Sequence, residues 1–524
     1  MTADLPASVA ATFAATAARL PERVFLVVLD ETARAYGIEP GSICYADAAA
    51  VVARLAAAYR AAGYGTGHRI GLMLENRPAF FLHWLALNGL GAGVVPLNPD
   101  LRPAELDYLV HHSGIVLGVA AAPHAEALRA VAGAMPVILD EDAPPPVAVR
   151  AADRAPIRED ECALLYTSGT TGRPKGCILS NDYFLRAGAW YAAIGGMCTL
   201  RDGDRLITPL PLTHMNAMAY SAMAMIMSGG ALVQLDRFHP RGWWDAVRTS
   251  GATIVHYLGV MPSMLLGLAA DPRDRDHAVR FGFGAGVDRR HHAAFEARFG
   301  FPLLEAWAMT ETGAGAVVIA NHEPRHVGTA CFGRPEPAVE IRIEPSDGEL
   351  LVRAAGADPR AGFFTAYLND PDATAEAWDG GWFHTGDIVR AAPDGSLCFV
   401  DRKKSLVRRS GENISAVEVE SALRRHPDVA EVAVAAAPDD LRGEEVLACI
   451  VARAPPADPA ASAAAIVRMA LQDLSYFKVP GWVAFVDALP LTASQKIARG
   501  EMKLLARRLL DAGACIDTRG LKRR

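Results

Sequence analysis

Apolar runs of strand length alternate with segments of helical periodicity through most of the first 400 residues. Residues 68–74, 93–97 and 115–119 have the composition of strands, and residues 77–91 and 105–113 between them carry apolar side chains at helical spacing. This alternation predicts parallel strands that are covered by helices on both faces of a sheet. We therefore expect an α/β fold.

The pattern changes towards the C-terminus. Short strand-like runs separated by turns occupy residues 340–400, which predicts a smaller β-rich subdomain. After residue 404, helices near 416–425 and 460–474 and strands near 429–436 and 446–452 predict a separate α+β domain of about 120 residues. The expected chain is a large N-terminal domain of parallel or mixed sheets with flanking helices and a β-rich subdomain, followed by a small α+β domain.

Charge and cysteine spacing exclude several classes of protein. The 52 Lys and Arg residues against 59 Asp and Glu give a net charge of −7, so the chain has no overall attraction to nucleic acid or to an anionic membrane. The N-terminus has no targeting pattern, and the uncharged run 215–235 is interrupted by two glycines, which predicts a buried helix, a turn and a strand instead of a membrane span. The eight cysteines lack CxxC spacing, so we expect buried reduced cysteines, no zinc site and a cytoplasmic location.

A strand-like run at residues 163–166 leads into a segment of hydroxyl and glycine residues that includes Lys175. Glycines let backbone N–H groups approach phosphate oxygens, hydroxyls add donors, and the ammonium adds positive charge. The segment is not a GxxxxGK[ST] loop, because Gly176 follows the lysine. It predicts a phosphate-binding loop; the alternative is a flexible surface loop.

Residues 167–176, Thr-Ser-Gly-Thr-Thr-Gly-Arg-Pro-Lys-Gly, resemble the phosphate loop of the adenylate-forming superfamily of acyl-CoA synthetases, peptide-synthetase adenylation domains and firefly luciferase. The resemblance implies that ATP, with Mg²⁺, and a carboxylic acid give an acyl-adenylate and pyrophosphate, and that the acyl group then passes to a thiol. It places seven residues at the phosphates, of which Thr170 also lies at the magnesium: Thr167, Ser168, Gly169, Thr170, Thr171, Gly172 and Lys175.

Further motifs of this family follow in the same order. Residues 307–312 match its aromatic-Gly-x-Thr-Glu segment, which implies that Trp307 stacks on adenine, Thr310 contacts the α-phosphate and Glu311 binds magnesium. Residues 283–286 resemble the adenine-binding turn, and residues 382–387 match the segment whose Asp holds the ribose hydroxyls. The other residues that the resemblance places at the nucleotide are Gly284, Ala285, Gly286, Ala308, Met309, Asp387 and Arg402.

Two motifs lie in the small domain. Residues 401–404 resemble the family's hinge, with Asp401 in place of the usual Gly, and imply that residues 403–524 form a mobile domain that rotates about Lys404 against an adenylation core at residues 1–402. Residues 489–497 match the catalytic loop, with Gln495 in place of Gly, and imply that Lys496 bridges the substrate carboxylate and the α-phosphate. Rotation would present a thiol-binding segment to coenzyme A, formed by Arg408, Ser410, Gly411 and Glu412. Arg409 fits a phosphate contact and a solvated turn equally well.

The hinge region looks closest to carnitine/crotonobetaine-type CoA ligases, and no carrier-protein segment follows residue 497, so we expect coenzyme A as the acceptor. By the same resemblance His214 lies beside the substrate, and the acyl pocket is lined by Met215, Asn216, Met218, His256, Met261, Ala308 and Gly313. Ala308 leaves room for more than acetate, and Asn216 and His256 add polarity, although a hydrogen-bonded core histidine is the favoured interpretation of His256. We expect a small to medium organic acid, with a polar or dicarboxylic acid as an option.

Other functions remain open at this point. An adenylating enzyme that loads a carrier protein, or an oxidative luciferase-like enzyme, would carry the same motifs. A non-catalytic sensor or scaffold would be expected to have lost Lys175, Glu311, Asp387 or Lys496, and all four are present. The expected partners are the acid, ATP and CoA, without nucleic acid or a membrane span; the oligomeric state is open, a homodimer included.

Overall fold

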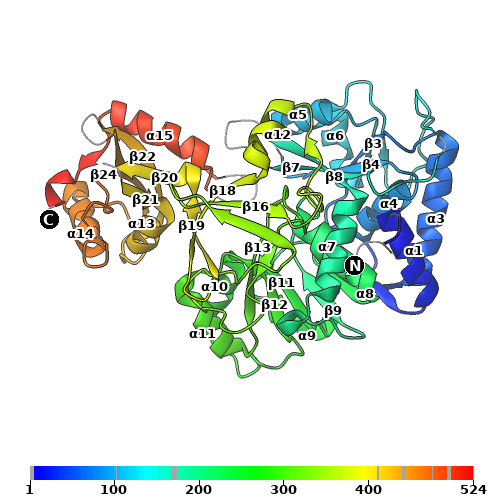
Figure 1. The fold of residues 1–524 in the computed structure, drawn as a ribbon, viewed down its shortest axis with the longest axis horizontal. Helices are drawn as coiled ribbons and strands as arrows, with labels where there is room; N and C mark the ends of the chain where they lie inside the picture. The colour runs from blue at the N-terminus through cyan, green and yellow to red at the C-terminus, as the bar shows by residue number, and fades with distance from the viewer. Residues whose placement is uncertain are drawn as a thin grey trace.

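A computed structural model describes residues 5–101, 103–152, 154–167, 174–409, 412–439, 443–474, 476–491 and 497–522. The chain forms two large sheets whose strands are interleaved in sequence, a small antiparallel sheet and a C-terminal sheet (Figure 1). Within the described residues, no helix is both long enough and apolar enough to cross a membrane.

The first large sheet has eight strands in the order β14-β13-β12-β11-β9-β10-β1-β2. Its six inner strands run parallel, and the edge strands β14 and β2 run antiparallel to their neighbours. The strands are β1 (Val24–Val28), β2 (Gly41–Cys44), β9 (Arg205–Thr208), β10 (Ala231–Gln234), β11 (Ile254–Leu258), β12 (Phe281–Ala285), β13 (Leu303–Trp307) and β14 (Val318–Ile319).

The second large sheet has seven strands in the order β17-β8-β7-β4-β3-β5-β6. Strands β7, β4, β3, β5 and β6 run parallel, as the strand–helix alternation predicts, while β8 and β17 are antiparallel additions. The strands are β3 (Arg69–Met73), β4 (Gly93–Pro96), β5 (Leu117–Ala120), β6 (Val137–Leu139), β7 (Glu161–Thr167), β8 (Lys175–Ser180) and β17 (Ala366–Tyr367).

Helices cover both large sheets. Helix α4 is apolar on almost every side because it packs between β4 and the helices α1 and α3. The helices of this part are α1 (Val9–Arg19), α2 (Asp30–Tyr36), α3 (Tyr45–Ala62), α4 (Pro78–Asn88), α5 (Pro103–Ser113), α6 (Ala125–Val131), α7 (Asn181–Ala193), α8 (Met223–Ser228), α9 (Trp243–Ser250), α10 (Val260–Leu266), α11 (Arg289–Phe299) and α12 (Pro371–Ala377).

The uncharged run 215–235 folds as predicted into buried helix, turn and strand. A π-helix, Asn216–Ala222, continues directly into α8, and Gly229 ends the helix in the left-handed conformation (φ +74°) before β10 begins. A π-turn within a helix is rare and often marks a functional site.

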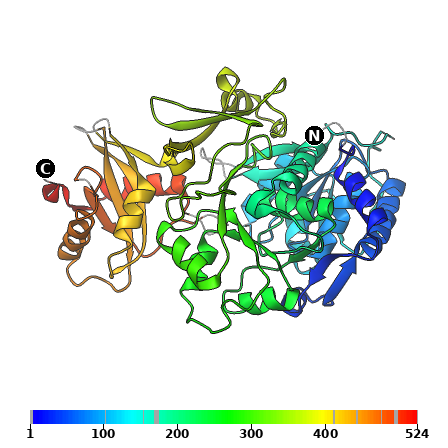
Figure 2. The ribbon, with the colours of Figure 1, turned by 60° about the horizontal axis from the view of Figure 1, so that its bottom comes forward.

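The β-rich subdomain is a four-stranded antiparallel sheet, β15 (Val339–Ile343), β16 (Glu349–Ala354), β18 (Phe383–Ala391) and β19 (Leu397–Arg402). Strand β19 leads directly into a short turn at Lys403–Ser405 and from there into the C-terminal unit, which lies to one side of the molecule (Figures 1 and 2).

The C-terminal unit is a six-stranded sheet with three helices. Its elements are β20 (Leu406–Arg409), β21 (Glu412–Ser415), α13 (Ala416–Leu423), β22 (Val429–Asp439), β23 (Gly443–Ala452), α14 (Pro459–Ala470), β24 (Trp482–Phe485), α15 (Arg499–Asp511) and β25 (Ile516–Asp517). Its apolar core consists of clusters that begin at Val407 and are separate from the clusters of the preceding units, whose last buried member is Leu397.

Candidate active site

Trp307 and Asp387 meet where two sheets adjoin. Trp307 ends β13, and its indole Nε1 donates a hydrogen bond of 2.8 Å to Oδ2 of Asp387 in β18. The indole also stacks on Phe332, with the ring planes 25° apart. The two residues that the sequence assigns to adenine and ribose thus lie side by side.

Asp387 is 1% exposed, and Arg402 lies opposite it in the β18–β19 register, with Nε 2.6 Å from Oδ1. Burial raises the pKa of the Asp387 carboxyl, and the charge of Arg402 and the Trp307 hydrogen bond act against that shift. Despite the ion pair, Oδ1 has no hydrogen bond of good geometry within the described residues. An under-satisfied buried carboxylate oxygen suits a ribose hydroxyl donor.

The turn after β12 requires glycine. A Cβ at Gly284 would lie 2.3 Å from the carbonyl oxygen of Tyr257, and Gly286 has φ +80°. Buried Glu305 holds this turn, because its two oxygens accept from the backbone N–H groups of Gly286 (2.9 Å) and Val287 (3.0 Å). Glu305 was not predicted from the sequence, although a carboxylate within an apolar strand, two residues before Trp307, is a signal that could have indicated it.

Glu311 and Lys175, which the sequence assigns to magnesium and phosphate, both lie beside Tyr367. The Tyr367 hydroxyl donates to Oε1 of buried Glu311 (2.9 Å), and the Lys175 ammonium lies 4.8 Å from the centre of the Tyr367 ring. Lys175 also lies 3.9 Å from the carboxylate of Asp370. Tyr367 reaches this position because β17 pairs with β8, which begins at Lys175. Neither Tyr367 nor Asp370 was predicted, since this pairing joins segments nearly 200 residues apart.

The donor set at Glu311 fits a magnesium ion bound together with ATP. A carboxylate is a hard oxygen ligand, and Mg²⁺ is normally held by one or two carboxylates and by substrate phosphates. Among the described residues, no group of three or more His, Cys, Asp or Glu side chains could hold a metal. Glu311 would hold the ion together with the phosphate oxygens of ATP.

Two buried tyrosines hold the backbone of the segment after Trp307. Tyr183 donates to the carbonyl oxygen of Thr310 (2.9 Å), and Tyr220 of the π-helix donates to that of Gly313 (3.0 Å). Ala308, Met309 and Thr310 keep partly exposed side chains. This leaves them available to a ligand.

The predicted acyl-pocket residues lie along the π-helix, β11 and the start of α10. His214 is exposed, Asn216 is partly exposed, and Met215, Met218 and Met261 are buried. His256 is fully buried and hydrogen-bonded through both ring nitrogens to Tyr191, Ser221 and Asn216, so the core-histidine interpretation is confirmed and its side chain adds no exposed surface.

Several predicted residues lie outside the described residues. They are Ser168, Gly169, Thr170, Thr171 and Gly172 of the phosphate loop, Ser410 and Gly411 of the thiol segment, and Lys496. Lys404 lies in the short turn before β20. Arg408 is on β20, opposite Asn413 of β21, and Glu412 is on β21, opposite Arg409 of β20.

Arg409 does not face solvent. It is 7% exposed, and its Nε lies 2.9 Å from Glu445, which is fully buried and also accepts from Lys522 (2.6 Å). Neither interpretation of Arg409 offered by the sequence matches this inward ion pair. This triad of Arg409, Glu445 and Lys522 connects the C-terminal segment to β20, the strand that leads into the predicted thiol segment.

The hinge region is anchored on both sides. Lys403 binds Glu349 (2.5 Å) and Asp347 (2.9 Å) of the β-rich subdomain. Buried Asp401 accepts from the Ser415 hydroxyl (2.7 Å) and from the backbone of Val417 (3.2 Å), so its carboxylate joins the end of β19 to the start of α13.

The expectation that the cysteines are all buried and reduced was wrong. Cys331 and Cys398 form a disulfide, because residues 330–333 pair with β19 and bring the two cysteines opposite each other. Cys44 and Cys515 are partly exposed, whereas Cys162, Cys177, Cys198 and Cys449 are buried free thiols.

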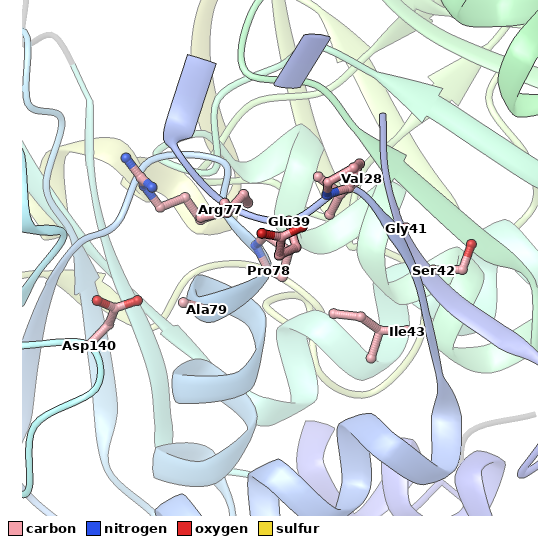
Figure 3. A pocket seen from close by; sticks show the side chains of 11 residues that line it. Val28, Glu39, Gly41, Ser42, Ile43, Arg77, Pro78, Ala79 and Asp140 are labelled. Carbon is pink, nitrogen blue, oxygen red and sulfur yellow. The ribbon is translucent and has the colours of Figure 1, made fainter. Parts of the chain in front are cut away.

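A separate cavity of about 360 Å³ lies between β1, β2 and the start of α4 (Figure 3). Its lining is mostly apolar, with Glu39, Arg77 and Asp140 among the polar members. Arg77 is already bound to Glu75 and to the carbonyl oxygen of Tyr36. No predicted site residue lines this cavity.

Comparisons with known proteins agree with the geometry. The family model described as AMP-binding enzyme matches residues 13–357, and the model of the AMP-binding enzyme C-terminal domain matches residues 418–496. The crotonobetaine/carnitine–CoA ligase of Salmonella typhi is 30% identical over 475 residues, which cover 84% of this chain and 89% of that protein.

Solved structures share the fold. The o-succinylbenzoate CoA synthetase of Bacillus subtilis, in complex with its acyl-adenylate intermediate, has a TM-score of 0.79 and 24% identity and covers 94% of this chain and 97% of its own. ATP-bound MatB of Rhodopseudomonas palustris has a TM-score of 0.77 and 25% identity and covers 95% of this chain and 99% of its own.

Proposed function

The chain belongs to the AMP-binding enzymes, and from this premise we propose that it is an ATP-dependent acid–CoA ligase that works through an acyl-adenylate. The observation that carries the proposal is the convergence of two clusters from distant segments. Trp307, Asp387 and Arg402 form one cluster, and Lys175, Tyr367 and Glu311 form the other. The first suits a nucleoside and the second suits its phosphates.

In the first half-reaction an oxygen of the acid's carboxylate attacks the α-phosphorus of ATP, and the bond to pyrophosphate breaks. Both reactants are anionic, so the protein contributes positioning and charge neutralisation. Trp307 and Asp387 hold adenine and ribose, Lys175 faces the departing phosphates, and Lys496 bridges the carboxylate and the α-phosphate. Glu311 would hold a magnesium ion together with the phosphate oxygens, and the bound ion would supply further neutralisation of the pyrophosphate charge.

In the second half-reaction the thiol of coenzyme A attacks the acyl carbonyl, and AMP leaves. We assign this step to a second orientation of residues 403–524, reached by rotation about Lys404, in which Gly411 and its neighbours line the path of the thiol. Asp401 and Lys403 anchor the two sides of that hinge in the orientation seen here. Such a rotation can limit turnover.

The acid is a small to medium organic acid, and the chain is a cytoplasmic enzyme in this proposal, since ATP and coenzyme A are supplied there. Coenzyme A is favoured over a carrier protein because the relatives that match most of the chain are named as CoA ligases. A protein that loads a carrier would form the same adenylate and differ only in the acceptor.

A pyrophosphate-release screen over carboxylic acids tests this function. We expect release with one acid class and, when coenzyme A is added, formation of the acyl-CoA and AMP. Absence of release with every acid class contradicts adenylation. If pyrophosphate is released but coenzyme A is not converted to a thioester, while a carrier protein is acylated, coenzyme A is not the acceptor.

A further inference from the structure

A closed hydrogen-bond network surrounds His256. The ring is fully buried, Nε2 lies 2.9 Å from the Tyr191 hydroxyl, and Nδ1 lies 2.8 Å from the Ser221 hydroxyl and 3.1 Å from Oδ1 of Asn216. Phe283 stacks on the ring at 4.7 Å. The imidazole is therefore enclosed by partners that carry no charge.

We assign the protons in this network from the burial of its members and from the acceptors available to them. Burial lowers the pKa of His256 to about 3, so the ring is neutral and has one donor and one acceptor nitrogen. The Tyr191 hydroxyl is buried and has no other acceptor among the described residues, so it donates a hydrogen bond to Nε2, and Nδ1 carries the ring hydrogen. The Ser221 hydroxyl donates to the backbone carbonyl of Asn216 (3.2 Å), which leaves Nδ1–H to donate to Ser221 Oγ and Asn216 Oδ1.

This assignment determines how the Asn216 amide is turned. The amide oxygen must face the Nδ1–H of His256, because in a flipped amide the NH₂ group of Asn216 would point at this N–H and two donors would face each other. The amide nitrogen is therefore directed away from the network, and no hydrogen-bond partner is recorded for it in the part of the chain that the structure describes. Asn216 is partly exposed and is the first residue of the π-helix.

The same π-helix is tied to the nucleotide motifs. Tyr220 donates to the carbonyl oxygen of Gly313, two residues after Glu311, and His256 pairs in register with Phe283, the residue before Gly284. The rings of Tyr220, Phe283 and Trp190 pack against one another beside the network. Asn216 thus keeps two amide N–H donors on a partly exposed residue of the helix that contacts Gly313.

We propose that Asn216 determines specificity by donating a hydrogen bond to an oxygen in the acyl portion of the acid, beyond the reacting carboxylate. The substrate class is then an organic acid with an acceptor oxygen, such as an oxo, hydroxy or second carboxylate group, on an otherwise apolar chain. His256, Ser221 and Tyr191 are positioning residues that lock the amide. This inference rests on the proposed function and narrows it.

A site built to hydrogen-bond a substrate group rejects the analogue that lacks it, because its own donor is then left unpaired. The probe is a set of straight-chain acids of four to eight carbons, each compared with its oxo analogues. The readout is the ratio of kcat/KM in pyrophosphate release. We expect at least one oxo position to be favoured over the matched alkyl acid by about tenfold or more.

Three variants sharpen the test. Asn216→Leu removes the donor and should bring the ratio close to one. Asn216→Asp keeps an oxygen towards His256 and replaces the donor by an acceptor, so it should lower turnover of the oxo acid while the alkyl acid is little changed. Ser228→Ala is the matched control, since its hydroxyl bonds only within its own helix, to Ala224 and Met225, and it should leave the ratio unchanged.

A wild-type ratio near one for every oxo position overturns the inference while leaving adenylation intact. The same holds if Asn216→Leu retains the wild-type preference. If no acid of any class releases pyrophosphate, the proposed function itself fails, which is a distinguishable result.

Discussion

The indole nitrogen of Trp307 donates a hydrogen bond to the Asp387 carboxylate at 2.8 Å, although 80 residues separate them in the chain. One residue belongs to β13, the strand next to the edge strand β14 of the eight-stranded sheet, and the other to the β-rich subdomain. The bond orients both the ring that would lie against adenine and the carboxylate that would hold the ribose. In the proposed function, a nucleoside would therefore meet a preformed pair.

Trp307→Phe keeps an aromatic face and removes the donor. A hydrogen bond to a charged group contributes roughly 1.5 kcal/mol or more, so we expect the KM for ATP to rise by about tenfold with a smaller effect on kcat. Steady-state kinetics with varied ATP measure this. The control is Trp382→Phe, because the Trp382 ring packs against the Arg353 guanidinium and, among the described residues, forms no hydrogen bond or ring contact with Trp307 or Asp387. Equal KM values for the two variants would contradict the role of the bond.

Tyr367→Phe removes the hydroxyl that orients Glu311. We expect the Mg²⁺ concentration that gives half-maximal pyrophosphate release to rise several-fold, because the carboxylate becomes free to rotate away from the metal. Titration of Mg²⁺ at fixed ATP, together with calorimetric binding of Mg·ATP, measures the change. Tyr36→Phe, which lies beside the separate cavity's Arg77, should have no such effect. An unchanged Mg²⁺ requirement in Tyr367→Phe would show that Glu311 is held by other contacts.

Lys522→Met leaves the buried Glu445 carboxylate with one cation instead of two. Removing one partner of a buried ion pair costs about 3 kcal/mol. Hydrogen exchange of the β23 amides should report a fall of that size in the free energy of opening. Lys503→Met is the matched control, because Lys503 is exposed on α15 in the same unit and should change the value by less than about 0.5 kcal/mol. Similar losses in both variants would argue against the triad.

The depressed pKa of His256 makes folding sensitive to acid. The folded ring titrates at about 3 and the unfolded ring near 6.5, so between these values the unfolded state binds more protons and stability falls as pH is lowered. At pH 5 the loss from this group alone is about 2 kcal/mol relative to pH 7. The variant His256→Asn does not titrate, so the difference in unfolding free energy between pH 7 and pH 5 should be smaller in it by that amount. An identical pH dependence in wild type and variant would refute the assignment.

The sequence motifs predicted the residues whose roles rest on short spacing. Trp307, Glu311, Asp387 and Arg402 could be predicted as site residues because each sits in a local pattern. The strands β3, β4 and β5 were predicted correctly because strands covered on both faces are apolar throughout. Tyr367 and Glu305 were missed because their roles depend on which strands pair, which local periodicity does not encode. The inward pair of Arg409 with Glu445 and the disulfide between Cys331 and Cys398 depend on strand pairing in the same way.

The central claim, that the acid is activated as an adenylate before a thiol is needed, is tested most directly by rapid-quench analysis of a single turnover in wild type and Lys496→Ala. We predict that wild type forms acyl-adenylate and pyrophosphate in amounts equal to the enzyme without coenzyme A, and releases AMP and thioester when it is added. Lys496→Ala should form no adenylate yet convert supplied acyl-adenylate to the thioester. Formation of ADP and phosphate, a wild-type requirement for coenzyme A before pyrophosphate appears, or adenylate formation at the wild-type rate in Lys496→Ala would contradict the account.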